Sequence, residues 1–190
     1  MYLKIGFLVV LLWLPPVLLA AELRYLGVTR CSNCHMEGGP SAVMEWSQGP
    51  HARAYQTLLS EKAKQIGASM SIVQPEASTQ CLVCHVTAVA KTFQKHGSAP
   101  YTEGVGCEAC HGAGQKYASY RVMKKLSNLK TRKPKLLRSY AKKVGFHVQG
   151  AEVCFQCHVK KRVYQGLSFL NPTYKPLDFE TSLMKIKHWR

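Results

Sequence analysis

The sequence predicts an all-α fold with abundant coil. Apolar residues recur at helical spacing over 117–130 and 135–144, and Pro134 stands where the second of these helices would begin. No convincing alternation of apolar and polar residues, as expected of a strand, is found along the chain. Three clusters of glycine, serine and proline predict loops, at 38–41, 97–106 and 171–176.

A further helix is predicted to begin at His51. Pro50 precedes this residue, and apolar side chains then recur at helical spacing as far as Ile66. Proline is common in the first turn of a helix. The pattern therefore places His51 on the buried side of the first turn.

The first 21 residues resemble an export signal. A single Lys4 is followed by an uncharged apolar run, which Pro15 and Pro16 interrupt, so the run is marginal for spanning a bilayer. We expect a signal peptide over residues 1–21, with an uncleaved N-terminal anchor as the alternative. Residues 22–190 would then form a single domain outside the cytoplasm.

All eight cysteines belong to four copies of Cys-x-x-Cys-His. The copies are CSNCH at 31–35, CLVCH at 81–85, CEACH at 107–111 and CFQCH at 154–158. Disulfides in an oxidising compartment or zinc knuckles would also use paired cysteines. Neither explains why a histidine follows every pair.

The five-residue motif is typical of c-type haem attachment. The two thiols bind the vinyl groups of one haem, and the adjacent imidazole binds the iron. We therefore predict four covalently bound haem c groups. The thioether cysteines would be Cys31, Cys34, Cys81, Cys84, Cys107, Cys110, Cys154 and Cys157. The proximal iron ligands would be His35, His85, His111 and His158.

Four histidines remain outside the motifs, one for each predicted iron. They are His51, His96, His147 and His188. A lone histidine is often an ordinary surface or core residue, but the equal numbers favour a second axial imidazole for every haem. We expect these four histidines to be the distal ligands and all four irons to be six-coordinate.

Together with the four motifs, three further segments resemble the tetrahaem cytochrome c554 family. They are Trp-x-x-x-Pro-His-Ala at 46–52, GVGCEACHGAG at 104–114 and FETSLMKIKH at 179–188. The resemblance extends over nearly the whole chain after the signal. It implies a mostly helical fold wrapped round closely stacked haems, electron transfer as the activity and a periplasmic location.

The length of the chain limits how it can be stabilised. Four haems leave roughly 40 residues each, which is too few for four separate apolar cores. The porphyrins must therefore supply much of the buried surface. We expect the chain without haem to be poorly folded.

The chain is strongly basic, with a formal net charge of +16. Eleven lysines and arginines and no acidic residue lie between Ala109 and Ala151. Haem propionates would offset part of this charge, but its concentration predicts that segment 116–143 docks an acidic redox partner protein. Nucleic acid is not expected as a partner of an exported protein.

These features predict a relay that passes single electrons between redox partners of a respiratory chain, and not an enzyme. A membrane-associated quinol-side donor would suit this role. One alternative is a haem enzyme that acts on a small nitrogen or sulfur compound at an open iron. Another is a subunit of a polymeric cytochrome wire in which His188 is lent to a neighbour, although a monomer is expected.

Overall fold

The computed structural model describes residues 23–36, 41–87, 101–147, 150–164 and 166–186. Its α-helices are α1 Val28–His35, α2 Ala42–Gln48, α3 Ala54–Thr57, α4 Glu61–Ser69, α5 Thr79–His85, α7 Cys107–His111, α8 Tyr120–Arg132, α9 Pro134–Val144, α10 Ala151–Cys154 and α11 Phe179–Ile186. Three 3₁₀ turns are η1 Pro75–Ala77, η2 Tyr101–Glu103 and η3 Gly114–Lys116. The strands are β1 Lys161–Tyr164 and β2 Leu167–Leu170.

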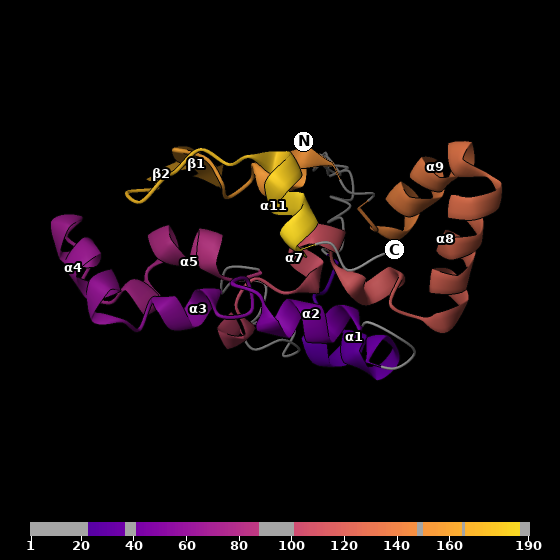
Figure 1. The fold of residues 1–190 in the computed structure, drawn as a ribbon, viewed down its shortest axis with the longest axis horizontal. Helices are drawn as coiled ribbons and strands as arrows, with labels where there is room; N and C mark the ends of the chain where they lie inside the picture. The colour runs from indigo at the N-terminus through magenta and orange to yellow at the C-terminus, as the bar shows by residue number, and fades with distance from the viewer. Residues whose placement is uncertain (1–22, 37–40, 88–100, 148–149, 165, 187–190) are drawn as a thin grey trace, which may run out of the picture.

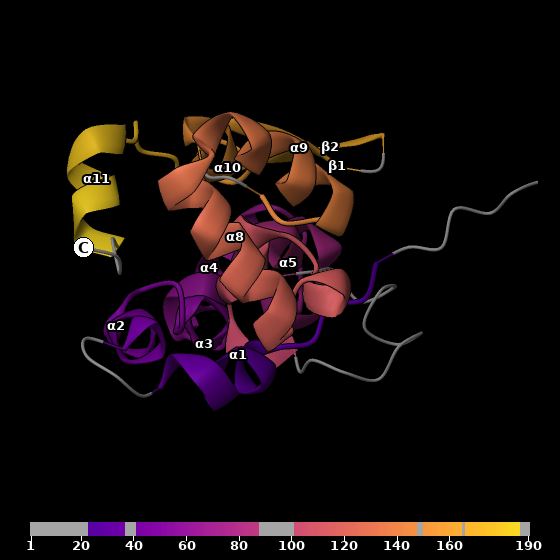
Figure 2. The ribbon, with the colours of Figure 1, turned by 90° about the vertical axis from the view of Figure 1, so that its right-hand side faces the viewer.

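The elements form two layers and a projecting helical hairpin. Helices α1 to α4 form the lower layer in Figure 1, and the C-terminal segment with β1, β2 and α11 forms the upper layer. The α8–α9 hairpin stands at one end of the molecule, as Figure 2 also shows from that end. The C-terminal segment therefore lies opposite the lower layer over the left and central part of the molecule in Figure 1.

The mostly helical fold confirms the predicted class, but it includes a strand pair that was not predicted. β1 and β2 are antiparallel, with Lys161 opposite Leu170 and Tyr164 opposite Leu167. Gly166, in the connection, has a φ of 76°, which is the left-handed region that glycine adopts readily. Strands of four residues are too short for a clear alternation pattern, which is why the sequence does not reveal them.

The prediction of one helix from His51 to Ile66 is wrong. The chain turns at His51, forms α3 and then begins a new helix, α4, after Ser60. The Ser60 hydroxyl accepts a hydrogen bond from the backbone N–H of Ala63 at 3.2 Å, and so caps the new helix. His51 consequently lies in the turn before α3 and not in the first turn of a helix.

The helices predicted over 117–130 and 135–144 are confirmed, but the first of them begins later than predicted. Pro134 is the first residue of α9, whereas α8 begins at Tyr120, three residues after the predicted start at Tyr117. Tyr117 is buried instead, and its hydroxyl donates a hydrogen bond to the carbonyl of Gly112. This contact ties the start of the hairpin to α7.

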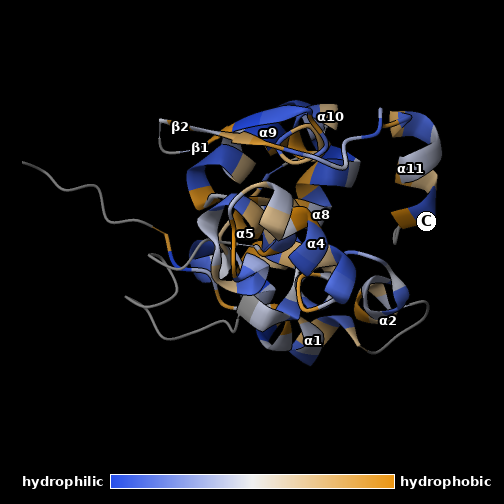
Figure 3. Ribbon diagram, turned by 90° about the vertical axis from the view of Figure 1, so that its left-hand side faces the viewer, coloured by the Kyte–Doolittle hydropathy of each residue, from blue (hydrophilic) through white to orange (hydrophobic). Residues whose placement is uncertain are grey.

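Buried apolar packing is limited in the part of the chain that the structure describes. One small cluster joins α3 to α5, and a second lies between α8 and α9. Their buried members are Tyr55, Leu58, Leu82 and Val86 in the first, and Tyr117, Leu126, Ala141 and Val144 in the second. Figure 3 shows apolar residues in short stretches over many helices and not in one central layer.

The predicted signal peptide, 1–21, lies outside the described residues. Where the structure does describe the chain, no helix combines the length and the apolar character needed to cross a membrane. The predicted loop at 171–176 is confirmed, since this segment contains no helix or strand. Of the predicted loop at 38–41, only Ser41 is described, where it caps α2.

Candidate functional site

All four Cys-x-x-Cys-His motifs lie at the ends of short helices. Helices α1, α5 and α7 end at His35, His85 and His111, and α10 ends within the fourth motif, which continues through a turn to His158. Residues three and four apart lie on the same side of a helix. In the three motifs that are wholly helical, the spacing therefore presents both thiols and the imidazole on one side. No disulfide joins any of the eight cysteines.

The motifs approach one another in pairs. The thiol of Cys31 in the first motif lies within hydrogen-bonding reach of Cys107 in the third. Cys84 in the second motif is similarly close to Cys157 in the fourth, and this hydrogen bond lowers the pKa of Cys84. Segments far apart in the sequence are thus brought together at their predicted haem-attachment residues.

The third and fourth motifs also lie close together, which connects the two pairs. Burial raises the pKa of Cys110 to about 11, and the nearby thiol of Cys154 in the fourth motif adds to the rise. The third motif is therefore a neighbour of both the first and the fourth. In space the motifs follow one another in the order first, third, fourth and second.

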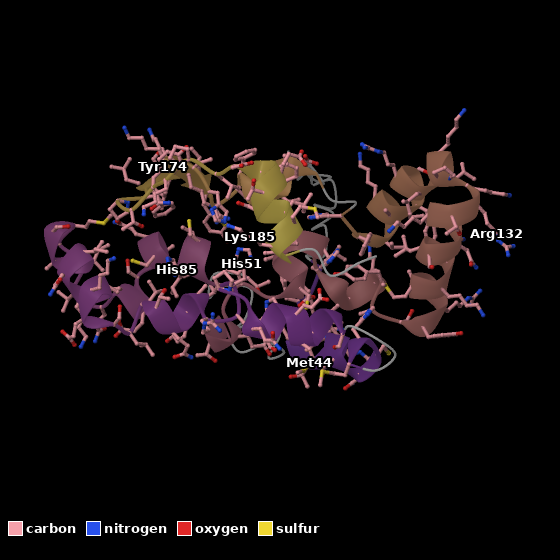
Figure 4. The ribbon with its side chains drawn as sticks, in the orientation of Figure 1. Met44, His51, His85, Arg132, Tyr174 and Lys185 are labelled. Carbon is pink, nitrogen blue, oxygen red and sulfur yellow. The ribbon has the colours of Figure 1, made fainter. Side chains whose placement is uncertain are left out.

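A cavity of about 1050 Å³ lies among these motifs. This volume is at the upper end of the range for small-molecule sites, about 300–1,000 Å³. Its lining includes cysteines of the second, third and fourth motifs together with His51, His85, His147 and His158. Figure 4 shows His51 and His85 between the two layers of the fold. The cavity therefore has both the size and the side chains that a bulky, metal-containing group requires.

Helix α11 contributes an apolar wall to the same cavity. Phe179, Leu183 and Ile186 line it at intervals of four and three residues, so they share one helix face. Two polar residues of α11, Ser182 and Lys185, also line the cavity. None of the residues of α11 is fully buried by the described part of the protein. An apolar face that lines a cavity of this size suits the apolar face of a porphyrin.

His51 and His158 have the relative position expected of two ligands to one metal. Their ring centroids are 6.1 Å apart, and the ring planes are inclined by 67°. A metal–imidazole bond is about 2 Å long, so two imidazoles on opposite sides of one metal have centroids roughly 6 Å apart. Burial, and secondarily the charge of His158, lowers the pKa of His51, which favours the neutral form that binds metals.

The backbone around His51 is held by the segment that precedes the third motif. The N–H of Val105 donates to the carbonyl of His51 at 2.9 Å, and the Trp46 indole donates to the carbonyl of Val105 at 2.8 Å. Gly104 has a φ of 76°, and a Cβ at this position would lie 2.6 Å from the His51 carbonyl oxygen. Segments 46–52 and 104–114, which carry much of the family resemblance, therefore pack together.

His85 is oriented as a ligand by its other ring nitrogen. Its Nδ1 lies 2.7 Å from the carbonyl oxygen of Ala54 and 3.2 Å from the hydroxyl of Thr57. A carbonyl can only accept, so Nδ1 carries the proton and Nε2 is left with its lone pair. This arrangement, in which the second nitrogen donates to the backbone, is typical of metal-binding histidines.

The third motif is enclosed by the end of the α8–α9 hairpin. Phe146 stacks on the His111 ring with centroids 5.2 Å apart, and the N–H of His147 donates to the His111 carbonyl at 2.9 Å. Gly112 has a φ of 81°, and a Cβ here would lie 2.4 Å from the carbonyl oxygen of Gly145. The close approach places His147 beside the third motif and on the wall of the cavity.

The remaining predicted ligands are less completely described. His35 ends α1, where its carbonyl accepts a hydrogen bond from the Ser41 hydroxyl at 2.6 Å. His96 and His188 lie outside the described residues. Their roles as distal ligands stay predictions from the sequence.

Glu108, inside the third motif, is a functional residue that the sequence reasoning missed. It is 4% exposed, and its carboxylate accepts hydrogen bonds from the backbone N–H groups of Leu26, Gly27 and Gly114 at 2.6–2.9 Å. It therefore fastens the segment that leads into the first motif against the third. The available signal was that Glu108 is the one acidic residue within any of the four motifs.

Arg162, on β1, was also missed. Its guanidinium donates to the carbonyl of Val83 and to the sulfur of Cys157, the latter at 2.9 Å, and lies 4.0 Å from the sulfur of Cys84. The positive charge thus lies where the second and fourth motifs meet. Among so many basic residues, the sequence offered no signal that singles it out.

Two sequence comparisons relate this chain to known proteins. The model of the family described as cytochrome c554 and c-prime matches residues 30–112. Cytochrome c-554 of Nitrosomonas europaea is 29% identical over 154 residues, which cover 78% of this chain and 62% of the relative. The chain spans about three fifths of the length of this curated relative. The resemblance to the cytochrome c554 family is confirmed.

The fold is also similar to that of a solved relative. The reduced state of cytochrome c554 from Nitrosomonas europaea superposes with a TM-score of 0.52 at 23% identity, over 87% of this chain and 79% of that chain. The match extends beyond residues 30–112 to most of the described fold. The predicted cofactor, covalently bound haem c, agrees with the family resemblance.

Replacing Glu108 by glutamine is expected to destabilise the protein by about 2 kcal/mol, because hydrogen bonds to a buried charged acceptor are weakened. The amide would also turn an N–H group toward backbone donors. The free energy of unfolding from guanidinium titration measures the effect. Glu45→Gln, at an exposed position of α2, is the matched control and should change stability by less than about 0.5 kcal/mol. Equal stabilities of the two variants would contradict the assigned role of Glu108.

Proposed function

We propose that this chain is an exported tetrahaem c-type cytochrome that relays single electrons between redox partners. The observation that carries the proposal is the connected series of motifs, in which each attachment site neighbours the next. Covalently held haem iron supplies one-electron chemistry when bound. A continuous series of such sites suits transfer through the molecule from one end to the other.

The contribution of the protein is to hold and orient each group. The cysteine pairs would anchor the macrocycles, and the proximal ligands would be His35, His85, His111 and His158. The 6.1 Å between the ring centroids of His51 and His158 would suit His51 as the second ligand of an iron held at the fourth motif. His147 is placed to serve an iron at the third or fourth motif, and the hydrogen bond of His85 to Ala54 fixes the orientation of a third imidazole.

Ligation by histidine on both sides favours an electron carrier over an enzyme. An iron enclosed by two imidazoles has no open position for a substrate, whereas a haem enzyme needs one. The approach of His51 to His158 supports closure at the fourth motif. The apolar N-terminal segment supports export, and we place the mature protein in the periplasm.

Intact mass of the mature protein is expected to correspond to four haems, with the signal removed. All eight cysteines should resist alkylation, because each is a thioether. Potentiometric titration should show low potentials, since imidazole on both sides stabilises ferric iron better than methionine does. A mass corresponding to fewer haems, or thiols that remain free to alkylate, would reject the tetrahaem assignment.

Replacing His51 by glycine is expected to convert one iron of the four to the high-spin state, visible by electron paramagnetic resonance. Added imidazole should enter the vacated space and restore the low-spin signal, because it replaces the ring that the substitution removes. Gln56→Gly, at an exposed position of α3, controls for disturbance of the backbone. If His51→Gly leaves every iron low-spin, another residue binds the iron of the fourth motif.

A further inference from the structure

The outer surface of the α8–α9 hairpin carries a concentrated positive charge. All eleven lysines and arginines between residues 116 and 143 are exposed. They are Lys116, Arg121, Lys124, Lys125, Lys130, Arg132, Lys133, Lys135, Arg138, Lys142 and Lys143. Figure 4 shows Arg132 projecting from the end of the hairpin away from the rest of the molecule. We call this set the basic face.

The charge of the basic face is not neutralised by the described part of the protein. There, the one ion pair joins Lys64 to Glu61, on α4 at the opposite end of the molecule. None of the eleven basic residues lines the cavity among the motifs, whose basic lining residues are Lys62, Arg162 and Lys185. The basic face is therefore turned to solvent and not toward groups bound in that cavity.

The hairpin is attached to the third motif at both of its ends. At its start, the Tyr117 hydroxyl donates to the carbonyl of Gly112, directly after His111. At its end, Phe146 stacks on the His111 ring and also contacts the Tyr117 ring, with centroids 5.1 Å apart. A protein bound to the hairpin would thus lie beside the third motif, and the second motif would be at the far end of the series.

We propose that the basic face is the docking surface for an acidic redox protein, which exchanges electrons with the haem of the third motif. This inference rests on the proposed electron-relay function and adds the partner's chemistry and the haem that it meets. A dense charge of one sign raises the encounter rate with an oppositely charged partner by about 10- to 1,000-fold. Transient redox complexes have small interfaces, so guidance by charge suits them.

An acidic protein suits the basic face better than an anionic membrane. Helices that bind membranes present an apolar face for insertion into the lipid. In the hairpin, Leu126, Ala141 and Val144 are buried in the hairpin's own cluster. The large apolar side chains that remain exposed are Tyr120 and Leu136, at 75% and 53%. The free surface is therefore charged with little apolar area.

The test measures reduction of the haem-loaded protein by reduced plant-type ferredoxin, an acidic redox protein used as the probe. The hairpin variant reverses four charges: Lys124→Glu, Lys125→Glu, Lys133→Glu and Arg138→Glu. At low salt its rate with ferredoxin should fall by about tenfold or more. The wild-type rate should fall as ionic strength rises past about 0.1 M, where the screening length is about 10 Å.

A control variant makes the same change of net charge at the opposite end of the molecule, with Lys64→Glu, Lys160→Glu, Lys161→Glu and Lys175→Glu. Its rate with ferredoxin should remain within about threefold of the wild-type rate. Reduced riboflavin, which is small and needs no docking surface, should reduce all three proteins at rates within about threefold of one another. If riboflavin reduces no haem in the wild type, the result contradicts the electron-relay function itself and not the choice of docking surface.

Nuclear magnetic resonance identifies the haem that the partner meets. When oxidised ferredoxin is added to the oxidised protein, the haem methyl signals that show Overhauser contacts to Phe146 should shift, and those of the second motif should not. Shifts at the second motif instead would overturn the proposal. Equal slowing of both charge-reversal variants would overturn it too, because net charge alone would then explain the rate. A third outcome would assign the basic face to a membrane. In that case phosphatidylglycerol vesicles would bind the wild type and not the hairpin variant, and ferredoxin would reduce both proteins equally fast.

Discussion

In the proposed haem-bound protein, the structure depends on the covalent attachment of bulky, flat groups to short helical segments. Two thiols and an imidazole at the spacing of the motif would hold a macrocycle in one orientation, so each motif needs little more than one helical turn. Segments between motifs can then be short and irregular, because the attached groups and not long helices would define the interior. The small apolar clusters of α3–α5 and α8–α9 fit this division, since each stabilises only its immediate surroundings.

Close approach of motifs from distant parts of the chain requires specific backbone features. Gly104 and Gly112 adopt positive φ where a side chain would meet a neighbouring carbonyl, and Glu108 binds backbone N–H groups of the segment before α1. These residues place His51 and the first motif against the third. Arg162 has the corresponding place between the second and fourth motifs. Both charged residues belong to junctions between motifs and not to any single one.

Much of this arrangement was predictable because its signals are local. The five-residue motif specifies its chemistry at adjacent positions, and the apolar stripes of α8 and α9 recur within one helix. The prediction of a single helix after His51 was wrong because Ser60 caps a new helix, although the apolar periodicity continues through this residue. The pairing of His51 with His158 and the spatial order of the motifs depend on contacts between residues far apart in the sequence, which no local pattern contains. The strands β1 and β2 were too short to show a period.

Amide hydrogen exchange tests most directly whether the haems supply the buried interior that the two small apolar clusters do not provide. The haem-loaded protein should be compared with the same chain carrying all eight cysteines as alanine and produced without haem. Slow exchange in α1, α5, α7 and α11 is expected only in the haem-loaded protein, because these helices carry motifs or line the cavity. Equal protection of these helices in both proteins would show that the polypeptide folds on its own packing, and would contradict the account.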